Sequence, residues 1–432
     1  MRNAIGRRAF APALCCAGLF VLLQVPALPG QDSKPSTGII NGTSTGKLKV
    51  PWAAFVPPGY ESSKASVPLL FKVHGMGGKG TDDISSAKKY GPKHNMIVVQ
   101  PTYTGLPMGR DWPSDPQCLQ SVNEIIGDFI AKYRIDTDNI FISGWSGGGL
   151  FMHNYMSTFK QPPAGGKPFR IKAILGTSAN FFRKTGLAGQ VHYFYTAGEK
   201  EEPHASGNYM VTQAVDAWRP HQLANKNREW TGRLHMIPNM GHTFPDEVRD
   251  LMAEFIDEVM GLGVPEFGPD ESFAYQKSSA AMLKDLKDGK TGAVLAKANR
   301  EQANKAEGKK FDADLVHVAE TVGKQAEARW AGLQAIPEEE RHRRIIELDA
   351  FAARMKGCVL ESEAAKLKKK WLESKVVREN LKAWTGLQSG YDLLADGKKT
   401  EAADAFTAYA KQCPGDPKKK YIEMLAQWCA KR

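Results

Sequence analysis

The sequence predicts an α/β domain followed by an all-helical region. In the first part, short β-branched and aromatic runs such as 67–73 and 140–145 alternate with stretches of helical periodicity such as 122–130. This alternation is typical of a mostly parallel sheet with helices on both faces. Beyond residue 277 the chain is rich in Ala, Lys, Glu and Leu and has little strand pattern, so it should be helical.

The length of 432 residues exceeds that of one ordinary domain, so we expect two folded parts. Segments rich in Ser, Thr, Gly and Pro mark the predicted linkers. The predicted order is a signal peptide at 1–30, a linker at 31–46, the α/β domain at 47–263, a second linker at 264–277 and the helical region at 278–432.

The N-terminus predicts export. Arg2, Arg7 and Arg8 precede an apolar run over 9–28, and a polar stretch follows at 31–34. A cleavable signal fits this pattern better than an anchor, so we expect a secreted or periplasmic protein with no membrane span after cleavage. The pair Arg7-Arg8 also weakly matches a twin-arginine signal.

Cysteine spacing and charge exclude some functions. Two of the six cysteines lie in the predicted signal, and the other four show no Cys-x-x-Cys spacing, so no metal and no cofactor are expected. Cys413 and Cys429 are either bridged or free. The net charge of +11 comes from bases interspersed with acids, which does not favour nucleic-acid binding.

A Gly-x-Ser-x-Gly sequence stands where a predicted strand passes into a helix. Ile140–Trp145 is the strand and Ser146 the centre of the motif, between Gly144 and Gly148. Strand, sharp turn and helix in this order form a nucleophile elbow, and glycines are needed where a Cβ would collide with its neighbours. Ser146 is therefore the candidate nucleophile, with the backbone N–H of Gly147 facing a developing oxyanion.

An earlier strand, Val67–Val73, ends in a glycine-rich loop, 74–78. Backbone N–H groups in such a loop can approach a bound oxygen closely. Met76 is the first candidate for the second oxyanion donor and Gly77 the next, although an ordinary turn would show the same pattern. We expect His74 to fix the loop through a side-chain hydrogen bond.

Two tryptophans are candidates for substrate binding. Trp112 lies in the loop 101–116, which follows a short predicted strand at 96–100. Loops at this edge of a parallel sheet often line the binding cleft, but Trp112 could equally cap the core. Trp145 directly precedes the candidate nucleophile.

Acid and base candidates follow later strands. The strand 191–196 leads into a loop with Glu199, Glu201 and Glu202, and Glu201 has the expected spacing after Gly198. The strand 234–237 leads to His242, just before a helix at 246–260. Nucleophile, acid and base in this chain order are typical of α/β-hydrolases.

Residues 47–263 resemble secreted α/β-hydrolase esterases, in the branch of polyhydroxybutyrate depolymerase-like, feruloyl and acetylxylan esterases, with dienelactone hydrolases as relatives. The similar stretches are 55–60, 69–78, 133–148 and Gly241-His242. The resemblance implies that Ser146 attacks a small or polymer-linked ester, His242 takes its proton, and Gly147 and Met76 hold the oxyanion. The family usually has Asp where this chain has Glu201.

The helical region contains one stretch, 393–406, that resembles a tetratricopeptide-like helix pair, with an echo at 286–290. It would bind a protein or cell-envelope component, or pack on the hydrolase as an appendage. Two further hypotheses remain. One is an inactive hydrolase-fold scaffold acting through these helices, and the other is a serine peptidase of the prolyl-oligopeptidase type.

Overall fold

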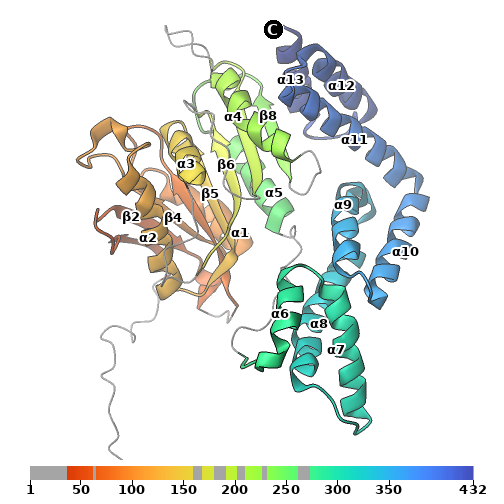
Figure 1. Cartoon of the computed structure of the whole chain (residues 1–432). Helices are drawn as coiled ribbons and strands as arrows, with labels where there is room; N and C mark the ends of the chain where they lie inside the picture. Colours follow the sequence, from red (N-terminus) through yellow and green to blue (C-terminus); the bar gives the residue numbers. More distant parts are fainter. Residues whose placement is uncertain are drawn as a thin grey trace, which may run out of the picture. The chain divides into compact units, whose positions relative to one another are not determined.

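The structure, a computed structural model, describes residues 37–61, 65–158, 168–179, 191–201, 210–225, 231–260 and 273–431. The predicted signal peptide lies outside these residues. Eight strands form one sheet in the order β1-β2-β4-β3-β5-β6-β7-β8 (Figure 1). The strands are β1 (Gly38–Thr43), β2 (Pro51–Val56), β3 (Val67–Val73), β4 (Ile97–Pro101), β5 (Ile135–Trp145), β6 (Ile171–Thr177), β7 (His192–Gly198) and β8 (Gly232–Ile237).

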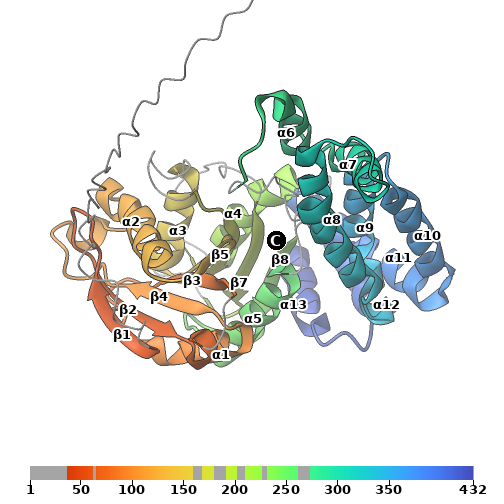
Figure 2. The same ribbon diagram turned by 90° about the horizontal axis from the view of Figure 1, so that it is seen from below.

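The sheet is parallel from β4 to β8, and β1 and β2 are antiparallel additions at one edge. Helices cover both faces, with α2, α3 and α4 on one side and α1 and α5 on the other (Figure 2). Every residue of β6 and β7 is buried, as expected of strands covered on both faces. The helices are α1 (Ala87–His94), α2 (Pro116–Lys132), α3 (Gly147–Thr158), α4 (Met210–Ala224) and α5 (Asp246–Met260).

The sheet begins earlier than the sequence predicts. Residues 38–43, which fall in the predicted linker 31–46, form the edge strand β1. Each residue of β1 is paired in register with β2, from Gly38 opposite Val56 to Thr43 opposite Pro51. A half-exposed edge strand needs few apolar residues because its partner supplies the hydrogen bonds, which explains why composition alone predicted a linker.

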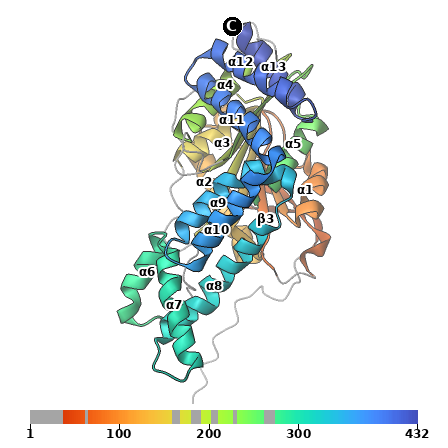
Figure 3. The ribbon, with the colours of Figure 1, turned by 90° about the vertical axis from the view of Figure 1, so that its right-hand side faces the viewer.

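The C-terminal region is helical, as predicted. Consecutive helices such as α11 and α12 pack on one another (Figure 3). A glycine at positive φ, Gly397, separates these two helices in the predicted pair. The helices are α6 (Ala280–Lys287), α7 (Thr291–Ala306), α8 (Ala313–Gln334), α9 (Glu338–Arg354), α10 (Val359–Glu373), α11 (Lys375–Ala395), α12 (Lys399–Gln412) and α13 (Lys419–Ala430).

The last three helices share their apolar core with the α/β domain. Tyr391 of α11 packs against Trp218 of α4, with 5.6 Å between the ring centroids. Its hydroxyl donates a hydrogen bond of 3.2 Å to the Leu234 carbonyl of β8. Since β8 is the last strand of the sheet, this contact satisfies a backbone group that an uncovered edge would expose. Helices α6–α10 instead pack around a separate core.

Two further features of the described residues bear on the sequence predictions. Within the described ranges, no helix combines the length and apolarity needed to cross a membrane. Cys413 and Cys429 are free thiols rather than a disulfide.

Candidate active site

Ser146 occupies a strained turn between β5 and α3. Its φ of +54° lies in the left-handed region, which costs a non-glycine residue on the order of 1–3 kcal/mol. The Ser146 N–H donates to the Thr177 carbonyl at 3.0 Å, so the neighbouring strand β6 holds the turn in place. This geometry lifts the Ser146 hydroxyl clear of the sheet, as a nucleophile elbow requires.

The glycines around Ser146 are sterically required. A Cβ on Gly144 would lie 2.3 Å from the Gly148 carbonyl oxygen. One on Gly148 would lie 2.4 Å from the carbonyl oxygen of Val73 at the end of β3. Real Cβ atoms do not approach backbone oxygens so closely, so only glycine lets the strand, turn and helix meet here.

His242 reaches the candidate nucleophile. Its Nε2 lies 2.9 Å from Ser146 Oγ, a hydrogen-bond distance, although the two residues are 96 positions apart in the chain. His242 comes from the loop between β8 and α5, at the same edge of the sheet as the elbow. In this position Nε2 can take the hydroxyl proton as Oγ attacks an electrophile.

The two oxyanion candidates lie side by side. A Cβ on Gly147 would be only 3.1 Å from the Met76 backbone nitrogen. Gly147 is the first residue of α3, so its N–H has no partner within the helix, and the helix dipole favours negative charge there. The pair can therefore supply two backbone donors beside Ser146.

His74 fixes the loop that carries Met76. Its Nδ1 lies 2.7 Å from the Gly75 carbonyl oxygen, and its Nε2 accepts the Tyr103 N–H at 3.0 Å. These two bonds define a neutral imidazole protonated on Nδ1, and burial lowers the pKa of His74. His74 therefore has the structural role that the sequence predicted.

The loop that begins at Glu199 after β7, called the acid loop from here on, differs from the prediction. The Glu201 carboxylate, predicted to face His242, accepts a hydrogen bond from the Ser178 hydroxyl instead. Its other oxygen, Oε2, is buried without a hydrogen-bond partner. The Glu199 carboxylate accepts the backbone N–H of Asn239 at 2.9 Å. Glu202, the third candidate, lies outside the described residues.

Ser178 is a site residue that the sequence analysis missed. It directly follows β6 and has a φ of +49°. Its hydroxyl holds Glu201, a carboxyl that is 4% exposed. Burial raises the pKa of Glu201 to about 7, while the Ser178 bond and a backbone bond at Gly198 lower it. A serine after a buried strand is too common a signal to have identified this pair.

The two tryptophans differ in position. Trp112 is 1% exposed and stacks on Tyr103 with ring centroids 5.2 Å apart. It therefore belongs to the core that supports His74, which corrects its predicted place in a substrate cleft. Trp145 is only partly buried, and its ring centroid lies 5.4 Å from that of His242.

Within the part of the chain that the structure describes, no three His, Cys, Asp or Glu side chains are grouped so as to hold a metal ion.

Comparisons with known proteins give structural matches alone. No family model and no curated protein sequence matches the chain. One similar solved structure is a poly(3-hydroxybutyrate) depolymerase from Bordetella parapertussis, at 16% identity and a TM-score of 0.39, covering 55% of this chain and 88% of that one. Another is an S-formylglutathione hydrolase from Agrobacterium tumefaciens, at 12% identity and a TM-score of 0.38, covering 52% and 96%.

These likenesses say nothing of the substrate, because a fold hosts many activities. The assignment of the fold rests on the molecule itself. A mostly parallel eight-stranded sheet carries a serine at a strained turn after β5, and a histidine after β8 reaches that serine. The chain is therefore a protein of the α/β-hydrolase fold with an additional helical C-terminal region.

Proposed function

We propose that the chain is an exported serine hydrolase that cleaves carboxylic esters. The observation that carries the proposal is the 2.9 Å contact between His242 Nε2 and Ser146 Oγ at a strained turn. Ser146 attacks the ester carbonyl while His242 takes its proton, and the Gly147 and Met76 N–H groups stabilise the tetrahedral oxyanion. The protonated His242 then protonates the leaving alcohol, and water releases the acyl group from Ser146.

The acid loop supplies the group that orients His242 in this proposal. Glu199 and Glu201 are bonded to Asn239 and Ser178, so Glu202 is the remaining candidate among the three glutamates. Export is part of the same proposal and rests on the basic and apolar pattern of residues 1–30. Sequencing the N-terminus of protein recovered from outside the cytoplasm tests it.

Hydrolysis of a p-nitrophenyl ester of a short acid tests the activity. We expect Ser146→Ala to lower kcat roughly a thousandfold or more while the circular dichroism spectrum is unchanged. Ser143→Ala is the matched control, because Ser143 lies on β5 three residues before Ser146 and its buried hydroxyl has no hydrogen-bond partner. It should retain activity within a few-fold.

An inactive scaffold is the alternative that this experiment decides. Glu199 and Glu201 support this alternative, because their carboxylates accept hydrogen bonds from Asn239 and Ser178 rather than from His242. Absence of turnover by the wild-type chain on acetyl, feruloyl and hydroxyalkanoate esters, or full activity of Ser146→Ala, would reject the esterase proposal. A peptidase would instead hydrolyse peptide amides faster than the matching esters.

A further inference from the structure

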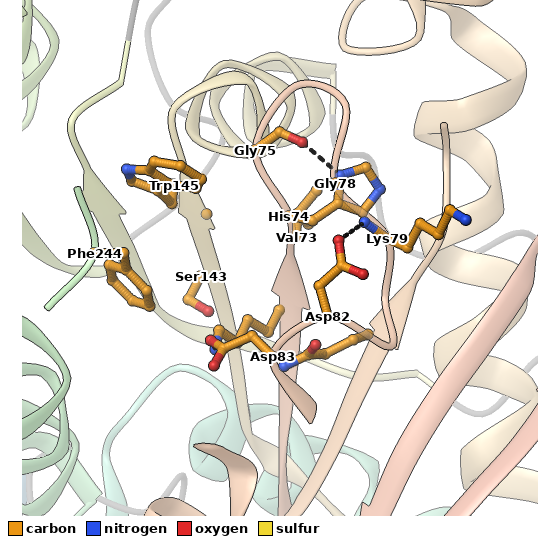
Figure 4. A pocket seen from close by; sticks show the side chains of 13 residues that line it. Val73, His74, Gly75, Gly78, Lys79, Asp82, Asp83, Ser143, Trp145 and Phe244 are labelled. Carbon is orange, nitrogen blue, oxygen red and sulfur yellow. Dashed lines mark hydrogen bonds and ion pairs between the residues drawn. The ribbon is translucent and has the colours of Figure 1, made fainter. Parts of the chain in front are cut away.

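A cavity of about 100 Å³ lies behind the catalytic loops and does not include Ser146 among its lining residues. Gly75, Trp145 and Phe244 form part of its wall (Figure 4). Each is a neighbour of a proposed catalytic group, because Gly75 precedes Met76, Trp145 precedes Ser146 and Phe244 follows His242 by two positions. The cavity therefore adjoins the proposed active site without being its nucleophile pocket.

Three polar side chains line this cavity from three adjacent parallel strands. Lys72 of β3 is in register with Ser143 of β5. Phe71 is in register with Val99 of β4, so the next pair along these strands is Lys72 with Gln100. In-register residues of parallel strands project on the same face, so the three form a polar row across an otherwise apolar part of the sheet.

The polar row carries hydrogen-bond donors that the protein does not use. Ser143 is 1% exposed and Gln100 is 3% exposed, and neither the Ser143 hydroxyl nor the Gln100 side-chain NH₂ has a hydrogen-bond partner. A buried donor without a partner costs on the order of 1–3 kcal/mol, so such groups usually serve a ligand or water. Both residues line the cavity.

Lys72 adds a charged donor. Its Nζ donates to Asp83 and to Ser86 Oγ, the latter at 3.0 Å. An ammonium has three N–H groups, so one remains. The nearby acceptors are already engaged, because the second Asp83 oxygen faces Arg249 at 3.3 Å. Arg249 also binds Asp246, and at the rim Asp82 accepts the backbone N–H of Lys79.

Apolar and aromatic side chains form another part of the wall. The Phe244 ring lies 5.2 Å from Lys72 Nζ and 4.9 Å from the Arg249 guanidinium carbon, so it shields this end from water. Val73 and Trp145 complete the apolar lining. A fitting ligand thus combines oxygen acceptors at one end with a short apolar body at the other.

We infer that this cavity is a binding site for a small aliphatic monocarboxylate. Its carboxylate accepts hydrogen bonds from Gln100, Ser143 and Lys72, and its apolar body lies against Trp145 and Phe244. The cavity volume of about 100 Å³ favours a ligand with a short chain. This inference goes beyond ester hydrolysis and does not depend on it.

Calorimetric titration of the full chain with butyrate tests the site, and butyramide serves as a neutral isostere. Both are also titrated into Ser146→Ala, so that binding against the Ser146 hydroxyl is recognised and failure of the esterase proposal leaves the test valid. We expect butyrate to bind wild type and Ser146→Ala alike, and butyramide to bind about tenfold more weakly through loss of a charge-assisted bond.

The double variant Gln100→Leu, Ser143→Ala should weaken butyrate binding about tenfold or more, since it removes two donors. Its thermal midpoint should stay the same or rise, because it also removes two unpartnered polar groups from the interior. Should the double variant not fold, Ser143→Ala alone deletes one hydroxyl and should weaken binding severalfold. Unchanged affinity in a folded variant, or no binding of butyrate to wild type, would show that the cavity holds only water.

Discussion

The loop that carries Ser146 and the loop that follows β7 are specified in different ways. Around Ser146, backbone oxygens lie so close that a Cβ at Gly144 or Gly148 would clash at 2.3–2.4 Å. The acid loop is also closely packed, since a Cβ at Gly198 would lie 2.2 Å from the Met240 carbonyl oxygen. The difference lies in the side chains that carry the chemistry.

At the elbow, one residue can serve as nucleophile, and the glycines around it identify that residue from the sequence. In the acid loop, three chemically equivalent glutamates occur within four positions. Their hydrogen-bond partners come from elsewhere in the fold, such as Ser178 after β6 and Asn239 after β8. Steric requirements can therefore be read from local sequence, whereas the choice among like charges requires the tertiary structure.

The largest expected effect comes from exchanging the glutamates one at a time. Glu202→Gln should lower kcat on a p-nitrophenyl ester by roughly four orders of magnitude, because a neutral amide can neither orient His242 nor stabilise its charged form. Glu199→Gln should change kcat less than tenfold, since its carboxylate binds the Asn239 N–H. The measurement is kcat for each variant at the same pH.

Glu201→Gln is the decisive comparison in this series. Gln keeps an acceptor for the Ser178 hydroxyl, so the loop should remain intact. A loss of kcat at Glu201 equal to that expected at Glu202 would restore Glu201 as the triad acid. Full activity of all three variants would instead mean that no glutamate of this loop orients His242.

The next largest effect tests the steric requirement for glycine around Ser146. Gly148→Ala should lower the free energy of unfolding by about 3 kcal/mol or more, because its Cβ would overlap the Val73 carbonyl oxygen at 2.4 Å. Gly147→Ala meets the Met76 nitrogen at 3.1 Å, so a smaller loss of stability should accompany a loss of kcat through a displaced oxyanion donor. Urea unfolding and ester hydrolysis measure the two effects.

Gly127→Ala provides the matched control, because no atom lies within 4 Å of its added Cβ on α2. It should stabilise the chain by about 0.4–1 kcal/mol through helix propensity. Equal stability of Gly148→Ala and Gly127→Ala would contradict the steric account of the elbow.

The same distinction explains how much of the whole structure could be predicted. Apolar runs and glycine turns predicted the sheet and the elbow, and composition predicted the helices of residues 278–431. The structure confirms this fold class. Residues 38–43 were missed because an edge strand depends on its partner β2. The burial of Trp112 depends on the rings of His74 and Phe151, which come from other segments, and on Tyr103 at the start of its own loop.

The packing of the helical region likewise could not be predicted from local sequence. Composition predicted helices, but not that Tyr391 would cover the β8 edge while α6–α10 form a core of their own. That division depends on which apolar faces meet. The contact of Tyr391 with β8 supports, for α11–α13, the prediction that the helical region packs on the hydrolase as an appendage.

The smallest expected effect tests whether the charge of Glu201 distinguishes the acid loop from the elbow. It is seen in the pH dependence of the free energy of unfolding. Burial raises the pKa of Glu201 from its ordinary value of 4.5 to about 7. The folded state therefore holds this proton more tightly than the unfolded state, so the contribution of Glu201 is fully present below pH 4.5 and is lost as pH rises through 7. Glu201→Gln should match wild type at low pH and exceed its stability above pH 7 by on the order of 1–3 kcal/mol.

Urea unfolding midpoints between pH 4 and 8 measure this difference, with Ser178→Ala as the opposing variant. The Ser178 bond lowers the pKa of Glu201, so its removal should extend the loss of stability to higher pH, whereas Glu201→Gln should abolish the loss. A gap between Glu201→Gln and wild type that stays constant across this range would mean that Glu201 titrates alike in both states. The acid loop would then hold Glu201 by shape, as the elbow holds Ser146, and the distinction between the two loops would fail.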